Sequence, residues 1–167
     1  MLCQTLAGNA CDMLTVTTFS DSPEKIRQKK GIVLSARVHP GETGSSFMMH
    51  GVIDYLTGPS VGAKILRDNF LIKVFPMLNI DGVINGNTRC SLAGVDLNRM
   101  WMDPQKDSHP VIYSLKWMIQ KLKEEREIVV FCDFHGHSRK KNIFMYGNSV
   151  KNDTKYKERI FPYMLEK

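Results

Sequence analysis

Hydrophobic residues along the chain fall into short continuous runs that alternate with helical patterns. Three runs are apolar nearly throughout, which is typical of strands that are covered on both faces of a sheet. They comprise residues 32–38, 70–75 and 128–134. The Thr- and Val-rich run 13–18 predicts an edge strand, and residues 143–146 predict a further short strand.

The segments between these strands predict helices. Residues 47–56 are expected to be helical up to Gly58-Pro59, and residues 63–68 to form a short helix. Residues 20–30 are basic and rich in turn-forming residues, so they predict a turn segment. A terminal helix is expected over residues 155–161, interrupted by Pro162.

The longest predicted helix begins at Ser108, whose hydroxyl can cap it, and ends near Glu125. Its apolar stripe at helical spacing consists of Val111, Leu115, Met118, Ile119 and Leu122. Before it, residues 79–107 are rich in Gly, Asn and Asp and lack periodicity. A loop of this length in a compact domain usually builds a site, the alternative being a solvated excursion.

Two of the apolar runs lead directly to histidines, His39 after residues 32–38 and His135 after residues 128–134. Strands that are separated by helices tend to run parallel, and open α/β sheets bind ligands beyond the carboxyl ends of their strands. The pattern therefore predicts an α/β fold with a mixed, largely parallel central sheet flanked by helices. It also predicts that both histidines meet at one rim.

His39, Glu42 and His135 form the donor set of a catalytic zinc site: two imidazoles and a carboxylate, with a fourth position for water. Gly41 and Gly136 allow the backbone to turn beside these side chains. The alternative for any one histidine is an ordinary structural role. The remaining histidines are expected to be surface or supporting residues, with His137 the preferred substitute ligand: His50, His109 and His137.

The length of 167 residues predicts one domain, and the net charge of +6 favours an acidic partner, the alternative being a merely basic soluble domain. The basic residues are dispersed, and no aromatic and basic module points to nucleic acid. The four cysteines show no C-x-x-C pair, so they are expected to be thiols in a reducing compartment. No basic leader and no apolar stretch of about 18 residues is visible. We expect a cytoplasmic location with no membrane anchor.

Four motifs make the chain similar to the zinc carboxypeptidases of the funnelin (M14) type, and within them to the cytosolic carboxypeptidases that shorten glutamate tails on tubulin and other proteins. They are Ala36-Arg37-Val38-His39-Pro40-Gly41-Glu42, residues 76–83, residues 86–99 and residues 132–147. The resemblance covers nearly the whole chain. Ile80 departs from it, because relatives carry proline in an Asn-Pro-Asp-Gly turn.

The resemblance implies that one Zn²⁺ ion is bound by the three predicted ligands. It also implies that Asn98 and Arg99 hold the terminal carboxylate of the substrate and that Arg89 polarises the scissile carbonyl. A guanidinium fork matches a carboxylate and stabilises a developing oxyanion. The run Arg139-Lys140-Lys141 is a candidate for attracting an acidic, glutamate-rich, tubulin-like tail, the alternative being solvated loop.

The family places its general-base glutamate on a late strand beyond the third ligand. Here Glu158 and Glu166 follow His135, both in the predicted terminal helix and without that motif. Proton transfer by such a base contributes about 10²- to 10⁴-fold to the rate. We therefore expect residues 1–167 to be the N-terminal portion of one zinc carboxypeptidase catalytic domain, incomplete at its C-terminal end. An exposed sheet edge would then cause poor stability or self-association.

Three functions remain at this point. The first is a zinc metallocarboxypeptidase that acts on glutamate-rich protein tails. The second is a related zinc amidohydrolase that deacylates small amino-acid conjugates, since both enzymes need carboxylate recognition. The third is a non-catalytic module that binds zinc or acidic tails. The length of the motifs at residues 87–91 and 135–147 favours the peptidase.

Overall fold

The computed structural model describes residues 1–19, 22–148 and 156–166. The chain forms two compact units, Met1–Gly136 (unit 1) and His137–Lys167 (unit 2). Unit 1 contains the sheet, its covering helices and all three predicted zinc ligands. Each unit is described by itself.

A four-stranded sheet forms the centre of unit 1, in the order β3 (Leu14–Val16), β5 (Phe70–Phe75), β4 (Lys30–Ala36) and β6 (Ile128–Phe134). Strand β4 runs parallel to both of its neighbours, whereas β3 pairs with β5 in the antiparallel sense. The predicted mixed, largely parallel α/β sheet is therefore confirmed. The predicted edge strand is also confirmed, because β3 lies at one end of the sheet.

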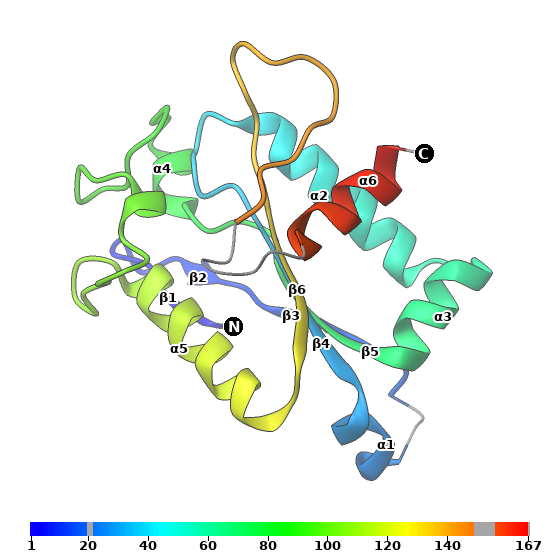
Figure 1. Cartoon of the computed structure of the whole chain (residues 1–167). Helices are drawn as coiled ribbons and strands as arrows, with labels where there is room; N and C mark the ends of the chain where they lie inside the picture. The colour runs from blue at the N-terminus through cyan, green and yellow to red at the C-terminus, as the bar shows by residue number, and fades with distance from the viewer. Residues whose placement is uncertain (20–21, 149–155, 167) are drawn as a thin grey trace. The chain divides into compact units, whose positions relative to one another are not determined.

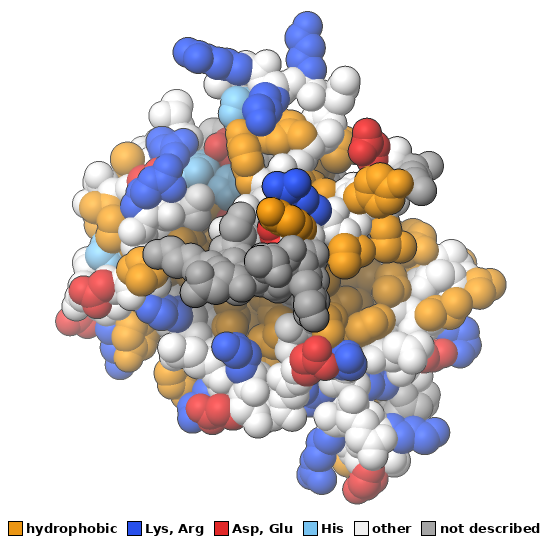
Figure 2. Space-filling model, in the orientation of Figure 1, with side chains coloured by type: hydrophobic (Ala, Val, Ile, Leu, Met, Phe, Trp, Pro, Cys, Tyr) orange, Lys and Arg blue, Asp and Glu red, His pale blue; other side chains and the backbone are white. Residues whose placement is uncertain are grey.

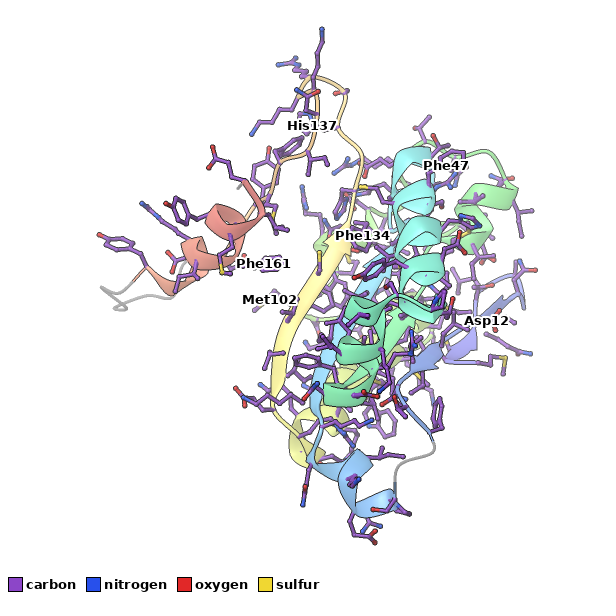
Figure 3. All side chains as sticks on the ribbon, turned by 90° about the vertical axis from the view of Figure 1, so that its right-hand side faces the viewer. Asp12, Phe47, Met102, Phe134, His137 and Phe161 are labelled. Atoms are coloured by element: carbon purple, nitrogen blue, oxygen red, sulfur yellow. The ribbon has the colours of Figure 1, made fainter. Side chains whose placement is uncertain are left out.

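Helices cover both faces of this sheet (Figure 1). On one face α5 (Pro110–Glu125) packs against Val33 and Leu71. On the other face α2 (Thr43–Thr57) and α3 (Val61–Asn69) cover β4 and β5. Side chains alternate along a strand, so Val33 joins the α5 core while Leu34 and Ala36 join the α2 core. Figure 3 shows Phe134 of β6 on the α2 side, in agreement with its packing there.

Several predicted elements differ from the structure. Within the expected turn segment, α1 (Pro23–Gln28) forms because Ser22 caps it and Pro23 suits the first helical turn. Residues 20–21 of that segment lie outside the described residues. His109 rather than Ser108 is the N-cap of α5, and its side chain makes no capping hydrogen bond.

The long segment 79–107 is mostly irregular, but it contains α4 (Ile80–Ile84) and the 3-10 helix η1 (Leu97–Arg99). Asn79 begins α4, since its side-chain oxygen accepts a hydrogen bond from the N–H of Gly82 at 3.1 Å. Asp96 begins η1 in the same way through the N–H of Asn98. Asx caps thus fold a segment that lacks apolar periodicity.

Unit 2 begins with an irregular stretch, so the strand predicted over residues 143–146 was wrong. Aromatic side chains pack around a lysine there instead: the Nζ atom of Lys140 lies 4.8 Å from the ring centre of Phe144 and 4.7 Å from that of Tyr146. The helical end consists of η2 (Lys157–Arg159) and α6 (Ile160–Glu166). Pro162 does not interrupt α6, because it lies in the first turn, where an N–H has no intrahelical acceptor. Residue 155 of that prediction lies outside the described residues.

A two-stranded hairpin near the N-terminus, β1 (Cys3–Gln4) with β2 (Ala10–Cys11), was not predicted. Its loop surrounds the carboxylate of Asp81, which accepts hydrogen bonds from Thr5 Oγ1 (2.6 Å), Asn9 Nδ2 (2.9 Å) and the N–H of Ala7 (3.0 Å). Burial alone would raise the pKa of Asp81, but these hydrogen bonds outweigh it and lower the pKa. Their contribution to stability is present above the ordinary carboxyl pKa and is lost as pH falls through the lowered one.

The loop that follows β4 is held in an unusual backbone conformation. Arg37 has a φ of 58°, a left-handed conformation that is rare for a residue with a side chain. Its Nε donates to the carbonyl oxygen of Pro40 at 2.8 Å, and its Nη1 donates to Ser46 Oγ at 2.7 Å. Gly41 then donates its N–H to the carbonyl oxygen of Thr88 at 2.8 Å. This loop carries His39.

Unit 1 has hydrophobic side chains exposed at the β6 end of the sheet. Val129 is 39% exposed and Phe131 is 47% exposed, and β6 is the outermost strand. Such an edge favours self-association, which stays a prediction. Among the described residues, no helix is both long enough and apolar enough to span a membrane.

We expect Thr5→Val to lower the free energy of unfolding by about 1–3 kcal/mol, because it leaves a buried carboxylate short of one hydrogen bond. Urea unfolding measures this change. The control is Thr57→Val, whose exposed hydroxyl bonds only to carbonyls of its own helix. It should change stability by less than about 0.5 kcal/mol. Equal effects of the two substitutions would show that the Asp81 hydrogen bonds do not stabilise the fold.

Gly41→Ala should destabilise the chain by roughly 1–3 kcal/mol, because the new Cβ would lie 2.7 Å from the carbonyl oxygen of Thr88 and the backbone must move. Gly44→Ala is the matched control three residues later, in the first turn of α2. No atom lies within 4 Å of its new Cβ, so helix propensity should make it neutral or stabilising by up to about 1 kcal/mol. Thermal melting of both variants distinguishes a steric effect at Gly41 from a general effect of losing glycine.

Candidate metal centre

His39 lies three residues beyond the end of β4, and its side chain is only 4% exposed. Its Nδ1 atom lies 3.0 Å from Glu42 Oε1 without the alignment of a hydrogen bond. This buried nitrogen therefore has no hydrogen-bond partner among the described residues. The other ring nitrogen, Nε2, lies 3.0 Å from Asp96 Oδ1. A buried polar atom without a partner is costly unless another ligand satisfies it.

His135 follows β6 directly and contacts the other carboxylate oxygen of Glu42. Its Nδ1 atom lies 3.0 Å from Glu42 Oε2, the oxygen that also accepts the N–H of Gly136 at 2.8 Å. Its Nε2 atom lies 2.8 Å from Asp133 Oδ2. The fully buried Ser35 of β4 donates its hydroxyl to the other Asp133 oxygen at 2.7 Å. The hydrogen bond with Asp133 raises the pKa of His135, against the opposing effect of burial.

The three side chains fit a metal ion. Their ligand atoms all lie within 4.8 Å of one another, and the two imidazole centres are 5.0 Å apart. Tetrahedral zinc with bonds of about 2.0–2.1 Å holds its ligand atoms roughly 3.3–3.4 Å apart, so small adjustments suffice. Each imidazole offers Nδ1 to the centre and places Nε2 against a carboxylate. Such outer carboxylates orient metal-binding histidines and increase their basicity.

Asp96 joins this centre to the predicted substrate residues. Its Oδ2 atom lies 2.8 Å from both Nε and Nη2 of Arg89, and its Oδ1 atom accepts the N–H of Asn98 at 2.9 Å. Burial raises the pKa of Asp96, but the Asn98 N–H, His39 and Arg89 together lower it. Asp96 is therefore a carboxylate that holds a candidate ligand on one side and a half-exposed guanidinium on the other.

The other two predicted substrate residues, Asn98 and Arg99, follow Asp96 in η1 and differ in how their side chains are held. The Asn98 side-chain oxygen accepts a hydrogen bond from Trp101 Nε1 at 2.9 Å, which orients the amide. Arg99 is exposed, and its Nη1 lies 3.5 Å from the Asn98 carbonyl oxygen. Arg89 and Asn98 are thus linked to His39 through Asp96, whereas Arg99 lies next to them in η1.

The remaining histidines have other surroundings. The Nδ1 atom of His137 accepts the N–H groups of Arg139 and Lys140, at 3.1 and 2.9 Å, within a turn of unit 2. His50 is exposed, with Nδ1 3.4 Å from Asp54 Oδ2, and His109 Nδ1 accepts the N–H of Gln105 at 3.1 Å. None of them belongs to the metal-binding group found among the described residues.

Sequence reasoning assigned no role to Asp96, Asp133 and Ser35. Asp96 stands two residues before Asn98, and Asp133 stands two residues before His135. These positions within the motifs could have indicated a role at the site. The hydrogen bond from Ser35 to Asp133 could not be predicted from the sequence, because it depends on how β4 pairs with β6.

Comparisons of this chain with known proteins all find zinc carboxypeptidases or their relatives. The family model "Zinc carboxypeptidase" matches residues 2–164. Cytosolic carboxypeptidase 2 of Mus musculus is 54% identical over 167 residues, which are 99% of this chain and 19% of that protein. Cytosolic carboxypeptidase 3 of Bos taurus is 51% identical over 170 residues, covering 100% of this chain and 17% of that protein. The chain therefore spans less than a quarter of the length of these relatives.

Among solved structures, a metallo-carboxypeptidase from Burkholderia cenocepacia superposes with a TM-score of 0.71 at 29% identity. The match covers 81% of this chain and 35% of that one. Zinc is the metal of the matched family, in agreement with the donor set found at the rim of the sheet. On its sheet, its candidate metal centre and these matches, the chain belongs to the zinc carboxypeptidase family.

Proposed function

We propose that His39, Glu42 and His135 hold the single zinc ion of a metallocarboxypeptidase. The observation that carries this proposal is the convergence of two Nδ1 atoms on one carboxylate, with Asp96 and Asp133 behind the imidazoles. When bound, zinc would acidify a water molecule and polarise a carbonyl oxygen. The Nδ1 atom of the buried His39 has no hydrogen-bond partner among the described residues, and this supports a metal ion beside it more directly than any motif does.

Arg89, Asn98 and Arg99 are proposed to bind the substrate. Arg89 is half exposed while its Nε and Nη2 atoms contact Asp96, so a ligand can reach the guanidinium without unfolding the loop. In that position it would stabilise negative charge that develops on a scissile carbonyl oxygen. Asn98 and Arg99 would bind the terminal carboxylate, Arg99 with a bidentate fork and Asn98 with a neutral donor.

We propose that the 167 residues form the N-terminal portion of one carboxypeptidase catalytic domain. The solved relative supports this, because the match covers 81% of this chain but only 35% of that one. In that arrangement Glu158 and Glu166 are not the general base. The proton acceptor would be supplied by the part of the longer catalytic domain that follows the third zinc ligand.

The proposed substrates are acidic, glutamate-rich protein tails of the tubulin type. The net charge of +6 supports this class, and so do the basic residues Arg139, Lys140 and Lys141. Figure 2 shows Lys and Arg side chains projecting from the loop at the top of the view, where Figure 1 draws the segment after β6. The names of the relatives support a cytosolic location for the whole protein.

Metal binding tests the ligand set. The purified chain should bind one equivalent of zinc, and His39→Ala or His135→Ala should weaken binding by at least about 100-fold because each removes one of three ligands. Asp96→Asn should weaken it by about 10- to 100-fold through loss of orientation. His50→Ala, which alters an exposed histidine of α2, is the matched control and should bind as the unaltered chain does. Competition with a chromophoric chelator measures all four, and a loss caused by His137→Ala instead would contradict the assignment.

Release of free glutamate from a peptide with a polyglutamate tail tests the reaction. A protein extended to the full catalytic domain should release glutamate, and Arg89→Ala should lower kcat with a smaller effect on KM. Arg139→Ala should instead raise KM in a salt-dependent manner if this loop attracts acidic tails. The 167-residue chain alone should bind zinc and release little or no glutamate. Hydrolysis of acyl amino acids without peptide cleavage would select the deacylase alternative.

A further inference from the structure

The N-terminal hairpin brings two thiols together on the α5 side of unit 1. Cys3 and Cys11 are direct partners in the antiparallel pairing of β1 with β2. Residues that oppose each other in such a pair have Cα atoms about 4.5–5.5 Å apart. A disulfide requires Cα atoms roughly 4.4–6.8 Å apart, so the backbone already meets its main geometric condition. Both residues are free thiols in this structure.

The two thiols have different surroundings that suit different steps of one reaction. Cys3 is partly exposed, and its Sγ atom lies 3.8 Å from the carbonyl oxygen of Pro110. A hydrogen bond from the Cys11 thiol lowers the pKa of Cys3 to about 7, against the opposing effect of burial. Cys11 is fully buried with Sγ 3.7 Å from the Met77 carbonyl oxygen, and the same contact with Cys3 raises its pKa. Cys3 is thus the accessible nucleophile and Cys11 the thiol held beside it.

We propose that Cys3 and Cys11 form a modification site that reacts with a low-molecular-weight disulfide such as glutathione disulfide and closes to an intramolecular disulfide. In the first step the Cys3 thiolate attacks one glutathione sulfur, a mixed disulfide forms and one glutathione leaves as thiolate. In the second step Cys11 attacks the Cys3 sulfur of the mixed disulfide, and the second glutathione leaves with the proton of the Cys11 thiol. The two cysteines lose two electrons and two protons, and glutathione disulfide is reduced to two glutathiones.

The other two cysteines provide internal controls. Cys132 packs into the core on the α2 side, where burial raises the pKa of its thiol. Cys90 lies in the loop before Asp96, and its carbonyl oxygen accepts the Asn87 side-chain N–H. Neither residue has a cysteine opposite it in a strand pair. Selective oxidation of one pair among four thiols is therefore the specific claim.

The hairpin loop connects this site to the rest of unit 1. The loop that closes β1 and β2 supplies Thr5, Ala7 and Asn9 to the carboxylate of Asp81. A disulfide between residues 3 and 11 would fix the base of that loop. Oxidation should therefore stabilise the hairpin and its hydrogen bonds to Asp81 of α4. This gain in stability is independent of zinc binding and of hydrolysis.

Peptide mapping after equilibration in a glutathione redox buffer tests the proposal. Trypsin places the four cysteines in three peptides: residues 1–25 hold Cys3 and Cys11, residues 90–99 hold Cys90, and residues 127–139 hold Cys132. After oxidation of the folded chain, the peptide 1–25 should lose two hydrogens and carry no glutathione, while the other two peptides stay reduced. The equilibrium constant for this oxidation should be at least about tenfold higher for the folded chain than for the chain in denaturant.

Variants separate the two proposed roles. Cys11→Ser should accumulate a glutathione adduct on Cys3, and Cys3→Ser should leave the peptide 1–25 unmodified. The double variant Cys90→Ser with Cys132→Ser should oxidise as the unaltered chain does. A pair that stays reduced, a lasting glutathione adduct in the unaltered chain, or equal oxidation in the folded and denatured states would each overturn the proposal. The comparison of folded and denatured chain needs no variant, so a folding defect in Cys11→Ser does not affect it.

Discussion

The parallel pairing of β4 with β6 is the constraint on which the candidate metal centre depends. These strands end side by side, with Ala36 opposite Phe134, so the residues that follow them emerge at one edge of the sheet. The pairing contains an irregularity, because Gly31 is opposite Ile128 while Ile32 is opposite Val130. One residue of β6 is therefore left over at the start of the strand, and every later partner is displaced by one position.

That displacement decides which side chains can meet. Side chains alternate between the two faces of a sheet, so residues directly opposite each other share a face. With the displaced register Asp133 is opposite Ser35, and the two side chains are 2.7 Å apart. Without it Cys132 would be opposite Ser35, and the carboxylate that orients His135 would lose its buried donor. A local irregularity far from the rim thus controls the orientation of a candidate ligand.

Charge balance explains why the centre contains two carboxylates besides the one that belongs to the candidate ligand set. Glu42 contacts both imidazoles, whereas Asp96 and Asp133 lie behind them. The three negative charges of these groups offset the two of a bound zinc ion together with the one of Arg89. Without an ion, Arg89 supplies one positive charge, and the hydrogen bond with Asp133 raises the pKa of His135. A proton and a metal ion would therefore compete for a ring nitrogen of His135, which is the usual linkage in sites of this kind.

The predictable parts of the molecule are those whose signal is local. The strands β4, β5 and β6 were found within two residues of their ends, because strands covered on both faces carry continuous apolar runs. The candidate ligands His39, Glu42 and His135 could be named because short motifs contain them, and the structure brings the three side chains together. The β1 and β2 hairpin was missed because each strand has two residues and because its main anchor, Asp81, lies more than 70 residues away. The aromatic residues at 143–146 have strand-like composition, but no strand of the described chain pairs with them.

The position of His39 shows why the supporting contacts could not be inferred in this way. Its loop follows a left-handed Arg37, and such a residue persists only where its surroundings hold it. Asn79 provides one support, since its side chain donates to the carbonyl oxygen of Val38 and its N–H donates to that of Arg37. Asn79 is held in turn because its side-chain oxygen caps α4, whose Asp81 is bound by the N-terminal hairpin. A candidate ligand in the first quarter of the chain is therefore held by segments on both sides of it in sequence. The position of His39 thus depends on tertiary contacts as well as on its own motif.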